Sequence, residues 1–226
     1  MADPLPLTHP RLPGLTRSDF VVAPSNAVAL AMIDQWRDWP GGKLVLTGPP
    51  GSGKTHLAHI WAAEANARIL AARDLERAAV PELASTALVV EDADAIPDAA
   101  PQDALFHLHN LMREAQRPLL LTGSRAVASW PLTLPDLKSR LQGAQSAVLD
   151  RPDDTLLNAV LVKLFIERQL QVSPQVVHYL LRRMDRSFDA ARRVVEALDF
   201  ASLAQRRAIT TRLAAEVLDK IEGAES

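Results

Sequence analysis

A glycine-rich loop is the part of this sequence whose residue types and spacing are best suited to chemistry. Residues 48–55 read Gly-Pro-Pro-Gly-Ser-Gly-Lys-Thr and match the pattern G-x-x-x-x-G-K-[ST] in full. Gly51 and Gly53 lack a Cβ, so the backbone can turn sharply and aim several N–H groups at one polyphosphate. Lys54 can reach the β- and γ-phosphates, and the Thr55 hydroxyl can bind Mg²⁺.

The loop therefore predicts a site for ADP or ATP together with Mg²⁺. The predicted nucleotide-binding residues are Gly48, Pro49, Pro50, Gly51, Ser52, Gly53, Lys54, Thr55 and His56.

Two acidic residues follow a predicted buried strand. Residues 87–90 are Ala-Leu-Val-Val, and Glu91 and Asp92 come directly after them. A buried parallel strand carries terminal carboxylates to the edge of the sheet where the phosphate loop also lies. One acid can hold Mg²⁺ through water and the other can orient the attacking water, so we predict a metal site of Thr55, Glu91 and Asp92. A strand that simply ends in solvated acids is the alternative.

A third polar position follows another apolar run. Residues 118–122 read Pro-Leu-Leu-Leu-Thr and are followed by Gly123 and Ser124. A hydroxyl at the end of such a strand can reach the γ-phosphate or the water beside it, which makes Ser124 a candidate catalytic residue. A simple strand terminus would have the same sequence pattern.

The elements that must position these residues alternate between strands and helices up to residue 151. We expect strands at 44–47, 68–71, 87–92, 118–125 and 147–149, and helices at 26–37, 54–66, 101–116 and from about 136 to 141. From Pro152 onward the pattern is wholly helical, with helices near 154–169, 174–184, 187–204 and 210–221. The predicted fold is α/β, a parallel sheet flanked by helices, followed by a small all-α lid.

Three regions result from this pattern. Residues 1–18, with prolines at positions 4, 6, 10 and 13, are expected to form an extended arm. Residues 19–151 form the predicted nucleotide-binding core, and residues 152–226 form the predicted lid. The basic and acidic residues of the lid balance in number, which favours a solvated surface over a DNA-binding one.

Composition excludes several other classes of protein. The 226 residues include no cysteine, which excludes disulfides and thiolate metal sites and fits a location in the reducing cytoplasm. No run of about 18 apolar residues occurs, so we expect no membrane span. The formal net charge is −2, so no overall basic field would recruit nucleic acid.

The ordered set of motifs resembles the AAA+ module of the bacterial replication initiator DnaA. Residues 19–26 are similar to the segment ahead of that family's ATPase core, and residues 53–57 have the form of its Walker A motif. Residues 121–125 resemble its sensor I segment, residues 137–140 the box that carries its arginine finger, and residues 207–210 the closing part of its lid. The resemblance implies an AAA+ fold and a role for Arg140 as an arginine finger; a salt bridge between core and lid is the alternative.

Only residues 222–226 follow the last predicted helix, so we expect no DNA-binding domain. A DnaA-like ATPase of this kind resembles the Hda family of DnaA-homologous regulators. That resemblance implies DnaA as a partner and docking of an N-terminal peptide on the DNA polymerase sliding clamp. Leu5, Pro6 and Leu7 match the end of the family's Q-L-x-L-P-L peptide, whereas Ala2 and Asp3 replace its first two residues. Sequence-specific DNA binding and membrane association are not expected, and a homo-oligomer stays open.

Two departures from the family pattern concern hydrolysis. Glu91 stands where relatives have the aspartate that directs Mg²⁺, and the lid's sensor II arginine aligns with Asp189. Arg186 and Arg192, each one turn away, are the alternative sensors. We therefore expect weak or no intrinsic ATPase activity and ADP as the working ligand. The expected function is stimulation of hydrolysis of initiator-bound ATP; a helicase loader or a nucleotide-dependent scaffold is the alternative.

Overall fold

The computed structural model describes residues 15–96 and 99–224, and contacts divide the chain into two compact units. The first consists chiefly of residues 26–49 and 53–150, and the second chiefly of residues 151–224. The candidate clamp-binding residues Leu5, Pro6 and Leu7 lie outside the described residues.

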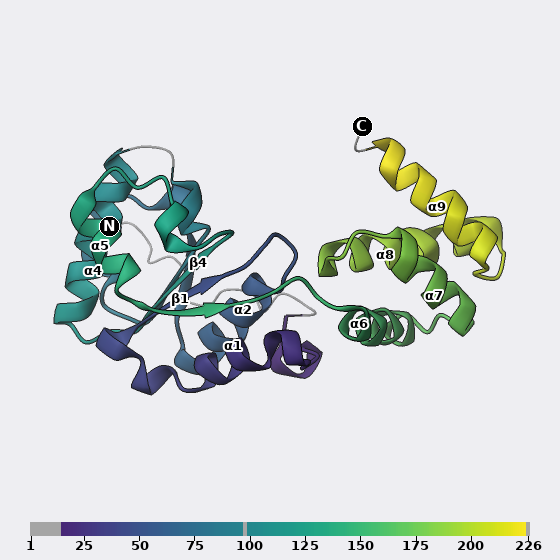
Figure 1. Ribbon diagram of the computed structural model, residues 1–226, viewed down its shortest axis with the longest axis horizontal. Coiled ribbons are helices and arrows are strands. Elements are labelled where there is room, and N and C mark those ends of the chain that lie inside the picture. The colour runs from purple at the N-terminus through teal and green to yellow at the C-terminus, as the bar shows by residue number, and fades with distance from the viewer. Residues whose placement is uncertain (1–14, 97–98, 225–226) are drawn as a thin grey trace, which may run out of the picture. The chain divides into compact units, whose positions relative to one another are not determined.

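The first unit is built on a five-stranded parallel sheet (Figure 1). The strands are β1 (Lys43–Thr47), β2 (Arg68–Ala71), β3 (Leu88–Glu91), β4 (Leu119–Gly123) and β5 (Gln145–Val148), and their order across the sheet is β2-β3-β4-β1-β5. The three central strands are almost continuous apolar runs because helices cover both of their faces. The register pairs Thr47 with Gly123, so the ends of β1 and β4 lie side by side.

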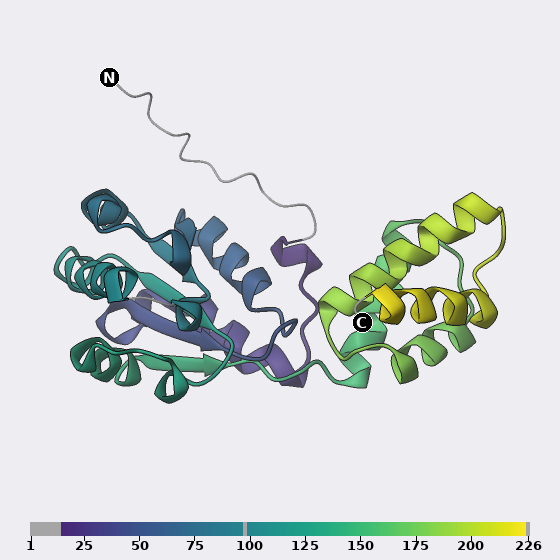
Figure 2. The same ribbon diagram turned by 90° about the horizontal axis from the view of Figure 1, so that it is seen from above.

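Helices cover the sheet on both faces (Figures 1 and 2). α1 (Pro24–Asp34) and α2 (Lys54–Ala65) pack against one face, where Trp61 and Leu57 are fully buried. α4 (Ala99–Glu114) and α5 (Pro135–Gln142) pack against the other face through residues such as Leu108 and Leu137. The expected α/β fold with helices on both faces of a parallel sheet is thus confirmed.

The second unit is a bundle of four helices with its own core. Its helices are α6 (Asp154–Glu167), α7 (Pro174–Arg183), α8 (Phe188–Gln205) and α9 (Thr211–Ala224). Leu161, Leu180 and Leu198 are fully buried in that core. The predicted all-α lid is confirmed, and within the described part of the chain no helix has the length and apolar character needed to cross a membrane.

The structure differs from the sequence-based expectation at α1 and between β2 and β3, and the other expected elements begin and end within three residues of their expected bounds. α1 begins at Pro24 and ends at Asp34, and a separate short helical turn at Trp36–Asp38 replaces its expected last residues. The stretch between β2 and β3, for which the sequence analysis predicts no helix, contains α3 (Val80–Leu83), and Val80 and Leu83 are buried against α4. Four residues carry too little periodicity to predict such a helix.

Candidate functional site

The phosphate loop leaves the end of β1 and leads directly into α2. Its first residue is tied to the neighbouring strand, because the Gly48 amide donates a hydrogen bond to the Gly123 carbonyl (3.2 Å). Gly51 and Gly53 have φ of +71° and +98°, which side chains with a Cβ adopt only with strain. Because α2 begins at Lys54, its N-terminal amides and dipole are available to an anion held by the loop.

Lys54 is buried, and the loop's own backbone holds its ammonium. Nζ donates to the carbonyl oxygens of Gly48 (2.7 Å) and Pro49 (3.0 Å), so the cation lies inside the loop where a phosphate would meet it. Thr55 is exposed and can reach a bound metal from the start of α2. The His56 ring contacts the Thr16 carbonyl (Nε2–O, 2.8 Å), which anchors the segment before α1 to the same helix.

Glu91 and Asp92 lie where β3 ends, at the edge of the sheet that also carries the phosphate loop. The Asp92 amide donates to the Thr122 hydroxyl at the end of β4 (3.0 Å), so the two strand ends are joined. Glu91 Oε1 is buried and has no hydrogen-bond partner among residues 15–96 and 99–224, and the same holds for Ser52 Oγ. A buried acceptor without a donor suits a hydrated cation, and a buried hydroxyl suits a phosphate, so these residues fit a nucleotide with Mg²⁺.

The hydroxyl of Ser124 is already committed to a neighbour that the sequence analysis missed. Asp94 is buried, and it accepts hydrogen bonds from the Ser124 amide (2.9 Å) and from the Ser124 hydroxyl. Arg125 approaches the same carboxylate (Nε–O, 3.6 Å). The acidic residue two positions after Asp92 was a visible signal, but nothing in sequence distinguishes a buried acid from a solvated one at that position.

Arg140 lies at the other edge of the sheet. Its guanidinium is 5.4 Å from the centre of the Phe106 ring on α4. It is close enough to lower the pKa of Lys43, the first residue of β1, whereas the phosphate loop follows the last residue of that strand. β1 is roughly 15 Å long. The structure thus brings together the loop, Glu91, Asp92 and Ser124, but it does not bring Arg140 to them.

No carboxylate lies within salt-bridge distance of Arg140 among the residues that the structure describes. A guanidinium that rests on an aromatic ring remains charged and can still meet an external anion.

The lid residues discussed as sensors all lie on or near the start of α8. Asp189 is exposed in the first turn of this helix, where a carboxylate is favoured by the helix dipole. Arg186 forms an exposed ion pair with Asp154 (2.9 Å). Arg192 is half-buried one turn after Asp189. The cap of α8 is Ser187, whose hydroxyl accepts from the Ala190 amide (3.1 Å), and Asp189 adds a negative charge that the helix dipole favours.

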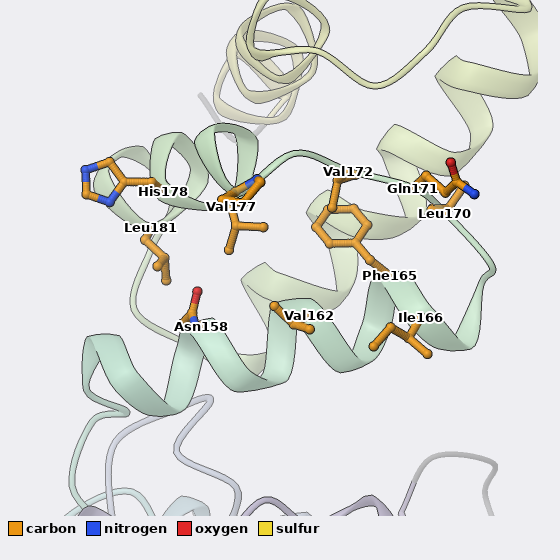
Figure 3. A pocket seen from close by; sticks show the side chains of 11 residues that line it. Asn158, Val162, Phe165, Ile166, Leu170, Gln171, Val172, Val177, His178 and Leu181 are labelled. Carbon is orange, nitrogen blue, oxygen red and sulfur yellow. The ribbon is translucent and has the colours of Figure 1, made fainter.

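The second unit also contains an apolar cavity of about 650 Å³ between α6, α7 and their connection (Figure 3). Val162 and Ile166 line it from α6, Val177 and Leu181 line it from α7, and Phe165 of α6 lies beside Val172 of the connection. These side chains offer apolar contact and no cations of the kind that bind phosphate. The cavity is therefore distinct in chemistry from the phosphate loop.

Comparisons with known proteins agree with this geometry. Residues 44–117 match the model of the ATPase family associated with various cellular activities (AAA), and residues 154–218 match the model described as Hda, lid domain. Domain III of the Thermotoga maritima replication initiation protein DnaA aligns with a TM-score of 0.82 and 19% identity, over 94% of this chain and 98% of that one.

Two further solved structures extend the comparison. AMPPCP-bound DnaA from Aquifex aeolicus aligns with a TM-score of 0.72 and 19% identity, over 95% of this chain and 70% of that one. The Thermotoga maritima RuvB Holliday junction branch migration motor aligns with a TM-score of 0.71 and 15% identity, over 90% and 71%. At these identities the structural likeness concerns the fold, whereas the match to the model described as Hda, lid domain, concerns residues 154–218.

Proposed function

We propose that this chain, a DnaA-like AAA+ protein that resembles Hda, binds a nucleotide and stimulates hydrolysis of ATP held by a replication initiator. In the proposed reaction the nucleotide-bound chain presents Arg140 to the ATP of a neighbouring DnaA subunit. An arginine finger neutralises charge on the transferring phosphoryl group and can raise the rate by roughly 10³–10⁵. Conversion of initiator-ATP to initiator-ADP would prevent a second firing of the origin.

The position of Arg140 is the observation that carries this proposal. Arg140 lies near the first residue of β1, and the chain's own phosphate loop follows the last residue of that strand. No carboxylate of the described residues neutralises it. A guanidinium so placed is better suited to a nucleotide on another subunit than to the nucleotide of its own loop.

The chain's own nucleotide has a structural role in this proposal. The loop amides and Lys54 would bind its phosphates, and the Thr55 hydroxyl with waters ordered by Glu91 and Asp92 would hold Mg²⁺. When bound, Mg²⁺ would neutralise part of the negative charge of the phosphates. Because the Ser124 hydroxyl donates to Asp94, its hydrogen is not available to a γ-phosphate. This supports weak intrinsic hydrolysis, with ADP as the working ligand.

Clamp docking is the part of the proposal that rests on sequence alone. Leu5, Pro6 and Leu7 match the end of a clamp-binding peptide and lie outside the described residues. An extended peptide with alternating apolar side chains can dock in the pockets of a partner. Binding to DNA-loaded clamp would couple inactivation of the initiator to a replisome already at work.

The test is hydrolysis of DnaA-bound ATP in the presence of DNA-loaded clamp, with wild-type chain, Arg140→Ala, Arg140→Lys and a Leu5→Ala/Leu7→Ala double variant. We expect stimulation by the wild type and its loss in Arg140→Ala. Arg140→Lys should recover little, because lysine lacks the planar fork of arginine. Nucleotide binding by each variant is the matched control, since the finger does not contact the chain's own nucleotide.

Absence of stimulation by the wild-type chain under all these conditions would reject the regulatory function. Stimulation that survives Arg140→Ala would reject the finger and favour a nucleotide-dependent scaffold. If only the double variant loses stimulation, the clamp contact alone is supported. Binding of the replicative helicase in place of DnaA would favour the helicase-loader alternative.

A further inference from the structure

Four basic side chains gather at the edge of the first unit where β1 begins. Lys43 is the first residue of β1, His109 and Arg113 lie on α4, and Arg140 lies on α5. Arg113 and Arg140 both act electrostatically on Lys43 and on His109, so both guanidiniums lie within electrostatic range of this pair. Among the described residues no carboxylate forms a salt bridge with any of the three cations. We call Lys43, His109, Arg113 and Arg140 the basic cluster.

Within the basic cluster, Lys43 and His109 form a hydrogen bond between Nζ and Nε2. His109 is almost completely buried, and burial together with the Lys43 charge lowers its pKa to about 4. The imidazole is therefore neutral near pH 7, and its Nε2 accepts the hydrogen bond that Lys43 donates. This hydrogen bond fixes the position of the Lys43 ammonium, which ends an otherwise flexible side chain.

Lys43 is only half-buried, so reagents from solvent can reach it. Burial, followed by repulsion from Arg113 and Arg140, lowers the pKa of its ammonium. A lowered pKa increases the fraction of neutral amine, which is the nucleophilic form. Lys43 thus combines a fixed position, access from solvent and two guanidiniums that can attract an anionic reagent.

We propose that Lys43 is a site of N-acylation by small acyl phosphates, with Arg113 and Arg140 attracting the phosphate group of the reagent. The neutral amine attacks the acyl carbon and a C–N bond forms. The bond between the acyl carbon and the phosphate oxygen breaks, and inorganic phosphate leaves with that electron pair. The surplus proton of the amine passes to the departing phosphate, so the products are an amide and hydrogen phosphate. This proposal does not rest on the proposed function.

The chemistry favours an acyl phosphate over other acyl donors because its leaving group is the part that the guanidiniums recognise. Arginine binds phosphate oxygens through a planar fork of N–H donors. A site with focused positive charge can raise the local concentration of an anionic reagent by about tenfold or more. Acylation would also remove one positive charge from the surroundings of Arg140.

The test uses the full chain and acetyl phosphate as the probe, with mass spectrometry of each lysine over time. The chain has few lysines to compare: Lys43, Lys54, Lys138, Lys163 and Lys220. Lys220 on α9 is exposed and serves as the internal reference. We expect Lys43 to be acetylated about tenfold faster than Lys220. An equal or lower rate at Lys43 would overturn the proposal.

A second arm isolates the role of the guanidiniums. Acetic anhydride, an uncharged donor, is applied in parallel, and the ratio of the two rates at Lys43 cancels any change in amine protonation. We expect this ratio to fall about tenfold in Arg113→Gln/Arg140→Gln. The control variant Arg182→Gln/Arg183→Gln removes two exposed arginines of α7 and should leave the ratio unchanged. A ratio that is the same in all three proteins would show that the guanidiniums do not recruit the phosphate.

Discussion

The Ser124 hydroxyl has one hydrogen to donate, and Asp94 accepts it together with the Ser124 amide. The buried carboxylate thus joins the segment after β3 to the end of β4. Removal of one partner of a buried hydrogen bond costs more than the bond itself contributes, because the remaining group stays unpaired. Asp94 therefore both holds Ser124 in place and contributes to the stability of the first unit.

We predict that Asp94→Ala lowers the free energy of unfolding by about 1–3 kcal/mol, because the Ser124 amide loses its acceptor. Asp94→Asn should cost less, since its amide oxygen can still accept one of the two bonds. Urea denaturation of the three proteins measures the difference. Asp103→Ala, which removes an exposed acid from α4, is the matched control and should change stability by less than about 0.5 kcal/mol. An Asp94→Ala protein as stable as that control would contradict the prediction.

At the scale of the element, the strand, loop and first turn of α2 act as one unit. The turn through Gly51 and Gly53 directs the chain into α2, and Lys54 at its first position folds back onto the loop. The hydrogen bonds of Lys54 to Gly48 and Pro49 hold the ammonium in place before a ligand arrives. Little rearrangement is then needed when a phosphate replaces the two carbonyls.

Lys54→Ala should weaken nucleotide binding by roughly 10- to 100-fold, which corresponds to the 1.5–3 kcal/mol that a hydrogen bond to a charged group contributes. Equilibrium titration with a fluorescent ADP analogue measures the dissociation constant. Lys163→Ala removes a half-buried lysine of α6 and is the control for loss of a positive charge. Equal affinity of Lys54→Ala and wild type would mean that the loop does not use Lys54 to hold phosphate.

The elements that carry the site could be predicted because their signals are local. An apolar run that ends in Glu91 and Asp92 predicts a buried strand and its polar end, and β3 is such a strand. The partners of Asp94 and His109 could not be predicted, because Ser124 is 30 residues from Asp94 and Lys43 is 66 residues from His109. His109 lies among the buried residues of α4, and only the packed sheet brings the start of β1 to it.

At the scale of the whole molecule, the basic cluster lowers the stability of the first unit. His109 faces Lys43 from β1, Asn110 and Arg113 from α4, and Arg140 from α5. None of these neighbours is an acid, so none of them compensates a charge on the buried imidazole. A proton on His109 would add a fourth positive charge to a group that has no described carboxylate partner, and folding must therefore keep this residue neutral.

This arrangement predicts a loss of stability in mild acid. Burial lowers the pKa of His109 to about 4, whereas in the unfolded chain it is near 6.5. Between these values the unfolded chain binds a proton that the folded chain does not. The part of the free energy of unfolding that depends on neutral His109 is therefore fully present above about pH 6.5. It is lost as the pH drops towards 4, by roughly 3 kcal/mol in total.

His109→Gln tests the prediction, because glutamine can still accept the hydrogen bond of Lys43 but does not titrate. Urea unfolding followed by tryptophan fluorescence reports on the correct unit, since Trp36, Trp39, Trp61 and Trp130 all lie within it. Carboxylates contribute to the slope of both proteins, so the difference between wild type and variant isolates His109. His107→Gln, on the same helix and half-buried, is the matched control. Parallel stability curves for wild type and His109→Gln between pH 6.5 and pH 4 would mean that His109 gains no proton on unfolding.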